Sequence, residues 1–297
     1  MHQLLQEIQQ GNFQALARAI TLVENNTADG NKLLQQLHLQ KSIPVIGITG
    51  PPGAGKSSLV NSLLDLLIAQ NKTVGVIAVD PSSPFNLGAL LGDRVRMSKH
   101  FNSGKVFIRS MASRGSLGGL CDKILEVTDV MRQAPFDFVL VETVGVGQSE
   151  VEIAGLADTT VVVLVPEAGD EVQTMKAGLM EIADVFVVNK ADHADADKLF
   201  LNLKTLVHEK MADEKIGVVK TIATQNEGTA DLLQQILLHH QSSQNQQRKL
   251  HLLTEKAWRI IQTKRMENVS RESLQNEIAA AINTEGFNIY KLAATHA

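Results

Sequence analysis

The sequence has little cysteine, few aromatic residues and no dense run of positive charge. Its 297 residues include a single cysteine, Cys121, which excludes an internal disulfide and a cysteine-based metal cluster and fits a reducing compartment. Lys and Arg number 28 against 32 Asp and Glu, a net charge of -4, so there is no electrostatic footprint for nucleic acid or an anionic membrane. We therefore expect a cytoplasmic protein that binds neither nucleic acid nor a membrane.

Two kinds of apolar segment are also missing. The N-terminus, M-H-Q-L-L-Q-E-I-Q-Q-G-N, lacks the basic and apolar regions of a signal peptide, and no stretch has the apolar length of a bilayer span. Hydrophobic residues nevertheless make up 44% of the chain, which is enough for the core of one large α/β domain with appendages.

Short β-branched runs alternate with amphipathic segments from Pro44 to about Ala223. They read VIGIT, VGVIAV, KVFI, FDFVLV, TTVVVLV, VFVV and VVKTIA. Continuous apolar strands separated by helices predict an α/β domain with a mostly parallel sheet and helices on both faces, which we place at 44–240. Helical spacing before it predicts an N-terminal helical extension over 1–43, with breaks near Gly11-Asn12 and Asn25-Asn26.

The C-terminal part is predicted to be a linker and a helical arm, residues 241–297. Residues 229–240 read as the last helix of the domain, and Q-S-S-Q-N-Q-Q, 241–247, reads as a polar linker. Beyond it a narrow apolar stripe requires a partner surface, either the chain's own domain or a second copy of the chain. The stripe consists of Leu253, Ala257, Ile260 and Ile261.

A phosphate-binding loop follows the first predicted strand. The stretch G-P-P-G-A-G-K-S fits G-x-x-x-x-G-K-[ST] and opens a helix at Ser58, so the domain is predicted to be a P-loop NTPase. Its backbone N–H groups can surround phosphate oxygens, its lysine can reach the β- and γ-phosphates, and its last hydroxyl can ligate Mg²⁺. The candidate nucleotide-binding residues here are Gly50, Pro51, Pro52, Gly53, Ala54, Gly55, Lys56, Ser57 and Ser58.

A second motif predicts which base is bound. Asn189-Lys190-Ala191-Asp192 follows a predicted strand and fits the N-K-x-D pattern of GTP-binding proteins. The Asp192 carboxylate can accept hydrogen bonds from N1 and N2 of guanine, whereas adenine would leave that charge unpaired. GTP is therefore expected over ATP, with Lys190 along the purine and Asn189 tying this loop to the phosphate loop.

A carboxylate stands at the end of the apolar run before a glycine turn, in V-E-T-V-G-V-G-Q-S-E. Glu142 to Gly145 occupies the place of the D-x-x-G switch of GTPases, with Glu instead of Asp. Asp80 and Asp93 also stand at predicted loop positions and, with Ser57 and Glu142, suit a magnesium shell. Helix capping is the alternative role for Asp80 and Asp93.

Seven stretches together resemble the MeaB/ArgK family, whose mitochondrial relative is the methylmalonic aciduria type A protein. They are G-P-P-G-A-G-K-S, V-D-P-S-S-P, L-G-D-R-V-R-M, S-R-G-S-L-G-G-L, V-E-T-V-G-V-G-Q-S-E, A-G-D-E-V-Q-T-M-K-A-G and N-K-A-D. The resemblance implies a GTPase chaperone that binds GTP or GDP with Mg²⁺ and serves an adenosylcobalamin-dependent acyl-CoA mutase. It also implies a homodimer and a cobalamin adenosyltransferase as a further partner, with adenosylcobalamin held by the partner enzyme.

The resemblance also implies roles for individual residues. Glu142 would complete the Mg²⁺ shell and orient or deprotonate the attacking water, and Gly145 would sense the γ-phosphate. Asp170 and Lys176 would lie in a third, partner-responsive switch, although Lys176 can equally be a solvated helix lysine. The remaining implied positions are Arg94 and Arg96 in the first switch. Two departures from the family pattern are Glu167, where Gly is more usual, and Thr221-Ile222-Ala223, where only the Ala223 backbone N–H remains to reach the guanine.

The function that the resemblance implies is GTP hydrolysis that gates adenosylcobalamin loading and protects or reactivates an acyl-CoA mutase such as methylmalonyl-CoA mutase. Lys56, Mg²⁺ and Glu142 supply positioning and charge neutralisation, but no arginine finger stands in the phosphate loop, so slow turnover accelerated by a partner is expected. The alternatives are a nickel-insertion metallochaperone GTPase, a kinase, and a nucleotide-dependent scaffold without functional turnover. A nickel site would need a His/Cys cluster, whereas only His239 and His240 are adjacent and a solvated pair is expected there.

Overall fold

The structure is a computed structural model, and the chain divides into two compact units, Met1–Gln247 and Arg248–Ala297. Each unit is described by itself. The described residues are 2–37, 43–80, 97–100, 103–112, 123–143, 153–166, 179–210, 216–241, 245–266, 269–282 and 287–296. No helix among them is long and apolar enough to cross a membrane.

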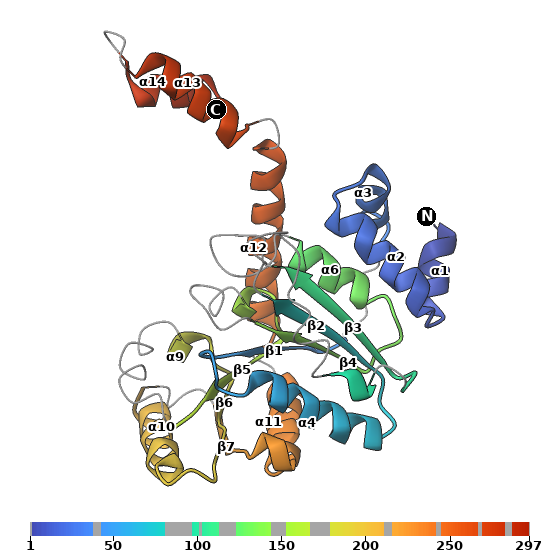
Figure 1. Ribbon diagram of the computed structural model, residues 1–297, viewed down its shortest axis with the longest axis vertical. Coiled ribbons are helices and arrows are strands. Elements are labelled where there is room, and N and C mark those ends of the chain that lie inside the picture. The colour runs from blue at the N-terminus through green and yellow to red at the C-terminus, as the bar shows by residue number, and fades with distance from the viewer. Residues whose placement is uncertain are drawn as a thin grey trace. The chain divides into compact units, whose positions relative to one another are not determined.

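The first unit is built on a seven-stranded sheet in the order β3-β2-β4-β1-β5-β6-β7, in which every neighbouring pair is parallel (Figure 1). Each of the seven predicted runs overlaps one strand, so the prediction of a parallel α/β P-loop fold is confirmed. The strands are β1 (Val45–Thr49), β2 (Val74–Asp80), β3 (Val106–Ala112), β4 (Phe138–Glu142), β5 (Thr159–Leu164), β6 (Val185–Val188) and β7 (Gly217–Lys220).

Helices cover both faces of this sheet because its strands are apolar on both sides. Along β5, Val161 and Val163 belong to one buried cluster and Val162 and Leu164 to another, as the alternation of a strand requires. One face is covered by α4 (Lys56–Ala69) and α11 (Thr229–Gln241). The other is covered by α6 (Ile124–Met131) and η2 (Ile153–Gly155) near β1 and β4, and by α9 (Leu179–Ile182) and α10 (Ala196–Lys210) near β5 and β6.

The predicted N-terminal helices are α1 (His2–Gln9), α2 (Phe13–Glu24) and α3 (Ala28–Leu34), and the first two end near the predicted breaks. The Asn12 side chain accepts hydrogen bonds from the first N–H groups of α2, and Thr27 does the same for α3. Phe13 of α2 contacts Phe107 and Phe136, with ring centroids 5.5 and 5.8 Å apart. The extension therefore shares a core with the β3 side of the sheet.

Two expectations at element ends need correction. The run VVKTIA does not continue as a strand to Ala223, because β7 ends at Lys220 and Thr221 turns to bond with Asn189. The polar stretch predicted as a linker is helical from Asn245, where α12 (Asn245–Arg265) begins. Its many glutamines have good helix propensity, so polarity alone does not make a linker.

The second unit consists of the remainder of α12 with α13 (Arg271–Ala281) and α14 (Ile289–Thr295). Large apolar side chains are exposed here. They include Leu250 (68% exposed), Leu253 (47%), Trp258 (60%) and Ile261 (47%) on α12. The predicted apolar stripe, Leu253, Ala257, Ile260 and Ile261, is thus exposed on α12.

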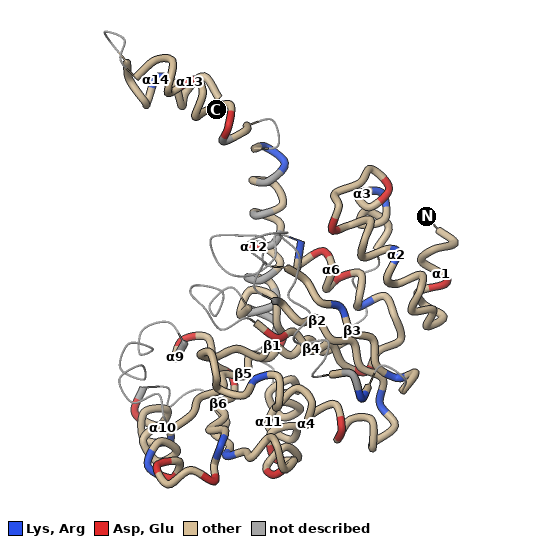
Figure 2. Tube along the Cα trace, in the orientation of Figure 1, with Lys and Arg blue, Asp and Glu red and all other residues tan. Residues whose placement is uncertain are grey.

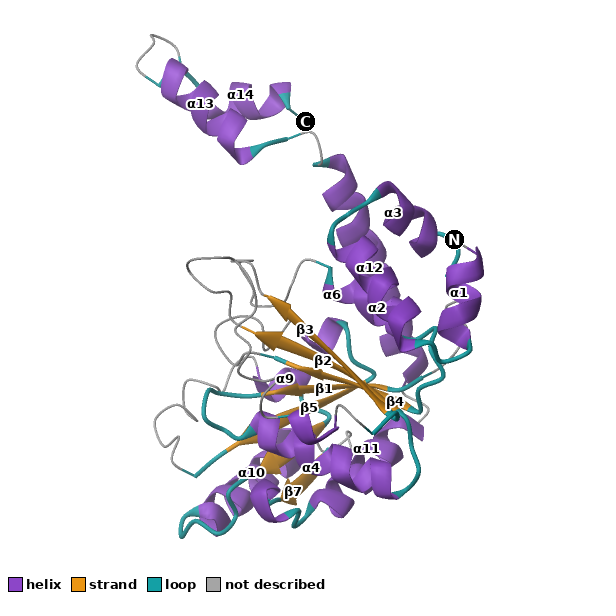
Figure 3. Ribbon diagram, turned by 45° about the vertical axis from the view of Figure 1, so that its right-hand side comes forward, coloured by secondary structure: helices purple, strands orange, loops and turns teal. Residues whose placement is uncertain are grey.

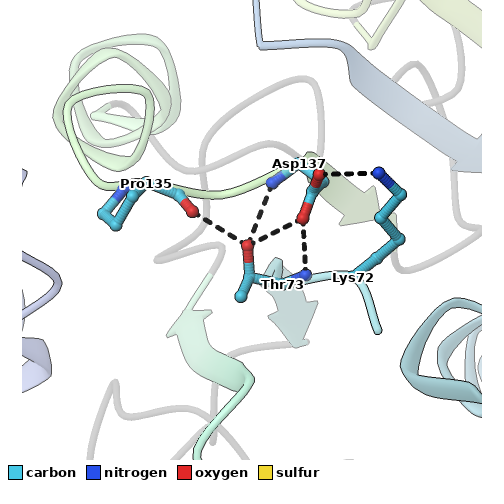
Figure 4. Close-up of polar contacts among 4 residues, drawn as sticks. All are labelled: Lys72, Thr73, Pro135 and Asp137. Atoms are coloured by element: carbon cyan, nitrogen blue, oxygen red, sulfur yellow. Dashed lines mark hydrogen bonds and ion pairs between the residues drawn. The ribbon is translucent and has the colours of Figure 1, made fainter. Parts of the chain in front are cut away.

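An acidic side chain, Asp137, joins two chain segments at the amino-terminal edge of the sheet (Figure 4). Asp137 precedes β4, and its carboxylate accepts hydrogen bonds from the Thr73 backbone N–H at 2.8 Å and from Lys72 Nζ at 3.1 Å. The Thr73 hydroxyl lies 2.8 Å from the Pro135 carbonyl oxygen. Burial alone would raise the pKa of Asp137, but these bonds from Thr73 and Lys72 outweigh it and hold the pKa below its usual value. This edge lies opposite the phosphate-loop end of the strands (Figure 3).

Candidate functional site

The phosphate loop connects the end of β1 to the first residue of α4. Gly50, Gly53 and Gly55 have φ of 140°, 74° and 83°, values that favour glycine over residues with a Cβ atom. Gly55 leads directly into α4, so the backbone N–H groups of a 14-residue helix begin at the loop. Such an N-terminus favours the binding of anions.

Two of these glycines also allow close contacts that a side chain would prevent. A Cβ on Gly50 would lie 2.1 Å from the Val163 carbonyl oxygen, and a Cβ on Gly55 would lie 2.4 Å from Asn189 Nδ2. A Cβ on Gly53 would have no heavy atom within 4 Å. Gly50 and Gly55 are thus required by both space and backbone conformation, and Gly53 by conformation alone.

The Lys56 ammonium group is held within the loop. Its Nζ donates to the carbonyl oxygens of Gly50 at 2.8 Å and Pro51 at 2.9 Å, and the residue is only 6% exposed. A buried positive charge beside a helix N-terminus makes this loop a strongly anion-attracting part of the molecule.

The carboxylate at the end of β4 faces the phosphate loop. Ser57 Oγ donates to Glu142 Oε1 at 2.6 Å, and Glu142 is 4% exposed. Residues far apart in sequence meet because β1 and β4 are parallel neighbours whose carboxyl ends share one edge. A hydroxyl and a carboxylate in contact form an oxygen-only donor set, which fits Mg²⁺, a hard cation that P-loop GTPases use with their nucleotide.

The other predicted members of this site are described only in part. The backbone of Asp80 ends β2 beside the β4 carboxyl end, since Ala78 pairs with Glu142 in register. The Asp80 side chain lies outside the described part of the structure. The predicted residues Asp93, Arg94, Arg96, Gly145, Glu167, Asp170 and Lys176 also lie outside the described residues.

Asn189 connects the two predicted loops. Its Nδ2 donates to the Ala54 carbonyl oxygen at 2.9 Å, and its Oδ1 accepts from Thr221 Oγ1 at 3.0 Å and from the Ala223 backbone N–H at 3.2 Å. The side chain is 3% exposed. One amide thus links the phosphate loop, the end of β6 and the turn after β7. The link to the phosphate loop was predicted from the sequence, and the link to the turn was not.

A pocket of about 340 Å³ lies beside this junction. Its lining residues are Gly55, Ser58, Asn189, Lys190, Asp192, His193, Ile222, Ala223 and Thr224. The structure therefore brings the phosphate loop together with Asp192 and the Thr221–Ala223 turn. Lys190 has φ of 55°, a left-handed conformation that is uncommon outside glycine and is found at functional loops.

His193 and Thr224 line the pocket but were not predicted from the sequence. His193 directly follows the N-K-x-D motif, and its backbone N–H donates to the Lys190 carbonyl oxygen at 2.9 Å, which closes the loop. Position next to the motif is the signal that could have identified it. Thr224 carries no comparable signal, because it lies within a 3₁₀ turn, η3 (Ala223–Gln225), that the strand pattern did not predict.

The expected solvated histidine pair at the end of α11 is only partly correct. His239 Nδ1 lies 2.9 Å from Thr159 Oγ1, and its Nε2 lies 3.3 Å from Asp184 Oδ1. The His239 side chain is 21% exposed, so it packs against the sheet edge instead of extending into water. Within the described ranges no group of three or more His, Cys, Asp or Glu side chains could hold a metal ion.

Comparison with known proteins identifies relatives of most of the chain. The family model described as "Methylmalonyl Co-A mutase-associated GTPase MeaB" matches residues 16–281. A protein of Pyrococcus horikoshii that is named a GTPase is 46% identical over 243 residues, 80% of this chain and 77% of that protein. The "GTPase ArgK" of Escherichia coli is 42% identical over 194 residues, 63% of this chain and 58% of that protein.

Two further similarities extend the comparison. The "Methylmalonic aciduria type A homolog, mitochondrial" of Caenorhabditis elegans is 38% identical over 208 residues, 65% of this chain and 52% of that protein. The crystal structure of an "LAO/AO transport system kinase" superposes with a TM-score of 0.70 at 24% identity, covering 99% of this chain and 95% of that one. At this identity the superposition supports the fold alone.

Proposed function

The chain belongs to the MeaB family of methylmalonyl-CoA mutase-associated GTPases, and from that premise we propose that it is the GTP-driven chaperone of an adenosylcobalamin-dependent acyl-CoA mutase. It is a P-loop GTPase that hydrolyses GTP. The finer proposal is that GTP binding and hydrolysis gate the loading of intact adenosylcobalamin and the protection or reactivation of the mutase. Adenosylcobalamin is held by the partner, and a cobalamin adenosyltransferase is a second partner in this proposal.

The observation that carries the proposal is the meeting of Ser57 and Glu142 at 2.6 Å beside the buried ammonium of Lys56. This arrangement combines a hydroxyl, a carboxylate and a fixed positive charge at the N-terminus of one helix. Phosphoryl transfer to water needs in-line positioning and neutralisation of the charge on the transferred group, and these groups are suited to both.

Each residue of the phosphate site has a distinct proposed role. The loop N–H groups from Gly50 to Ser58 bind the phosphates, and Lys56 exchanges its loop carbonyl partners for β- and γ-phosphate oxygens. Ser57 and Glu142 would hold Mg²⁺, with Asp80 and Asp93 completing its shell. The ion would supply charge neutralisation at the phosphates. Glu142 also orients the attacking water.

The base is proposed to bind in the pocket next to Asn189. Asp192 lines that pocket and would accept the two guanine N–H groups, while Lys190 would cover the purine face. The Ala223 backbone N–H would have to exchange its bond to Asn189 for one to the guanine carbonyl oxygen. These contacts support GTP, and not ATP, as the substrate.

Three further residues are proposed to couple hydrolysis to the partner. Gly145 would respond to the γ-phosphate, and Asp170 and Lys176 would respond to the mutase. Because the phosphate loop holds no arginine, turnover by the isolated chain is expected to be slow and the partner to accelerate it.

We further propose a homodimer formed through the C-terminal unit. Leu250, Trp258 and Ile261 of α12 are 68%, 60% and 47% exposed, a share of apolar surface that a second copy would remove from water. Light scattering of the full chain at micromolar concentration is expected to give twice the monomer mass. A monomer at that concentration would contradict the dimer.

The test of the function is GTP turnover by the purified chain, with ATP as control, alone and with an adenosylcobalamin-dependent acyl-CoA mutase from the same source. Preference for GTP and stimulation by the mutase are the expected results. If saturating mutase binds without changing the rate, the coupling is wrong.

A Glu142→Gln variant separates the chaperone from a scaffold. The variant keeps the size of the side chain but removes its charge, so GTP turnover is expected to fall about 100-fold or more, the usual scale for loss of an electrostatic group at a reacting centre. A chaperone driven by hydrolysis then loses its effect on the mutase, whereas a scaffold retains it. GTP-dependent nickel transfer would instead support a nickel-insertion GTPase.

A further inference from the structure

A pair of buried hydroxyl groups lies directly behind the candidate catalytic carboxylate. Thr49 is the last residue of β1 and Thr143 follows the last residue of β4. Thr143 Oγ1 donates to Thr49 Oγ1 at 3.0 Å, and the two residues are 2% and 0% exposed. A side-chain bond between neighbouring strand ends therefore joins the residue before the phosphate loop to the residue after Glu142.

The two sides of the sheet hold this point of the chain in different ways. The Glu142 side chain lies on the α4 side, where it accepts the bond from Ser57. Strand alternation places Thr49 on the same face as Gly47, and this face is the one opposite to Glu142. There the missing Cβ of Gly47 leaves room for Ile153 of η2. Between the two faces, the Thr143 backbone N–H donates to the Ile48 carbonyl oxygen at 3.1 Å.

These three bonds resist rotation of the chain at Glu142. A turn of the strand end about its own axis would move the Glu142 carboxylate away from Ser57, and it would have to break the Thr49–Thr143 bond on the other face. Backbone pairing with Ile48 of β1 and Ala78 of β2 holds the strand as far as Glu142, and the hydroxyl pair holds the residue that follows it. The hydroxyl pair thus adds a side-chain constraint on the direction in which the carboxylate points.

A hydroxyl is otherwise a costly choice at these positions. Apart from Glu142, the buried strand residues near Thr49 and Thr143 are aliphatic, among them Ile48 and Val141, and a buried hydroxyl without a partner costs free energy. Valine would fill nearly the same volume with no hydrogen-bond requirement. A specific need for the bond explains why two threonines meet here.

We propose that Thr49 is a positioning residue for GTP hydrolysis, acting through Thr143 to hold the Glu142 carboxylate toward Ser57. The inference rests on the proposed role of Glu142 in hydrolysis. It adds a residue that touches neither nucleotide nor Mg²⁺, and it places control of the catalytic geometry on the opposite face of the sheet.

The experiment compares variants that keep shape with variants that keep the hydroxyl. Thr49→Val removes the bond at nearly constant volume, and Thr49→Ser keeps it. Single-turnover GTP hydrolysis, GTP affinity and the Mg²⁺ concentration for half-maximal rate are measured for each. Thr49→Val is expected to lower the hydrolysis rate about fivefold to tenfold and to raise the Mg²⁺ requirement, with GTP affinity within about twofold. Thr49→Ser is expected to retain at least about half the rate.

A matched control and a double variant separate positioning from stability. Thr159→Val removes the 2.9 Å bond between the buried Thr159 and the partly exposed His239 at the amino-terminal edge of the same sheet, so it is expected to lower the melting temperature but not the hydrolysis rate. The single variant Thr143→Val leaves the Thr49 hydroxyl without its partner, whereas the double variant Thr49→Val/Thr143→Val removes both hydroxyls. The melting temperature of the double variant is therefore expected to be higher than that of Thr143→Val. The hydrolysis rate is expected to stay as low as in Thr49→Val.

Each contrary result has a defined meaning. A Thr49→Val rate within about 1.5-fold of wild type, while Glu142→Gln is strongly impaired, overturns the positioning role alone. Equal losses in Thr49→Val and Thr49→Ser, or recovery of the rate together with stability in the double variant, also overturn it. Wild-type hydrolysis by Glu142→Gln would overturn the proposed role of Glu142 and this inference with it.

Discussion

Replacing Gly55 by alanine tests how tightly the phosphate loop and the base loop are joined. A new Cβ at φ +83° forces a conformation that costs about 1 kcal/mol for residues other than glycine. The same Cβ would lie 2.4 Å from Asn189 Nδ2, so the amide must move and its 2.9 Å bond to the Ala54 carbonyl oxygen is lost. Losing a buried hydrogen bond adds about 2 kcal/mol, for a total of about 3 kcal/mol.

Gly53→Ala is the matched control within the same loop. Its φ of +74° imposes a similar conformational cost, but its Cβ meets nothing within 4 Å, so about 1 kcal/mol is expected. For a domain of this size, 1 kcal/mol lowers the melting temperature by about 2–4 °C. The expected losses are therefore about 6–12 °C for Gly55→Ala and about 2–4 °C for Gly53→Ala.

Urea unfolding of both variants, followed by backbone circular dichroism, measures the difference in the free energy of unfolding. Tryptophan fluorescence is unsuitable because the single tryptophan, Trp258, lies in the C-terminal unit and not in the GTPase unit. Affinity for GDP should fall further for Gly55→Ala, because Asn189 also holds the turn at Ala223. Equal losses of stability, or a larger loss for Gly53→Ala, would refute the argument that contact with Asn189 sets the cost.

Two further predictions concern an aspartate at the edge of the sheet and two glycines in turns next to it. Asp137→Asn should lower the melting temperature at neutral pH. Because the folded-state pKa of Asp137 is depressed, its stabilisation is full above about pH 4 and is lost as pH falls through the folded-state pKa. The difference in melting temperature from wild type should therefore close in acid. A gap that is constant with pH would contradict this linkage. Gly228→Ala puts a Cβ 2.0 Å from the Lys220 carbonyl oxygen at φ +72° and should cost about 3 kcal/mol or more, whereas Gly104→Ala, at φ +65° with open space around it, should cost about 1 kcal/mol in the same unfolding assay. Similar costs for the two glycines would show that backbone conformation, and not the contact with Lys220, dominates.

The strands could be predicted from the sequence because each is a short apolar run that the sheet buries on both faces. The breaks between the N-terminal helices were predictable as well, since Asn12 sits where an N-cap is required. The end of β7 was not, because Thr221 and Ala223 leave the strand direction to bond with Asn189, a residue more than 30 positions earlier. Local propensity carries no information about such a distant partner.

The candidate site shows the same division. Motif spacing predicted the phosphate loop and the contact of Asn189 with it, and the contact between Ser57 and Glu142 follows once β1 and β4 are known to be neighbours. The Thr49–Thr143 bond could not be predicted, because threonine in a strand is ordinary and the strand order β4-β1 is not written in any local pattern. Residues that act across the sheet therefore become visible only with the topology.

Acidic residues at the two edges of the sheet have different roles: those at the amino-terminal edge stabilise the fold, and those at the carboxyl-terminal edge belong to the candidate site. Charged positions of both signs are scattered along the trace in Figure 2, so sequence alone does not sort them. At the amino-terminal edge, three aspartates each precede a strand, accept a backbone N–H of a neighbouring chain segment and lie beside a basic side chain. They are Asp137 with Thr73 and Lys72, Asp158 with Val45 and Arg132, and Asp184 with Thr160 and His239.

The carboxylates at the carboxyl-terminal edge have another setting. Glu142 meets the hydroxyl that begins the phosphate-loop helix, and Asp192 lines the pocket. The three edge aspartates accept hydrogen bonds from backbone N–H groups at or next to the starts of neighbouring strands, so their replacement should cost stability and leave the ligand specificity unchanged. Replacing Glu142 should instead lower GTP turnover, and replacing Asp192 should weaken the preference for guanine. Ligand sites in such folds lie outside the carboxyl ends of the parallel strands, which leaves the opposite edge to close the fold.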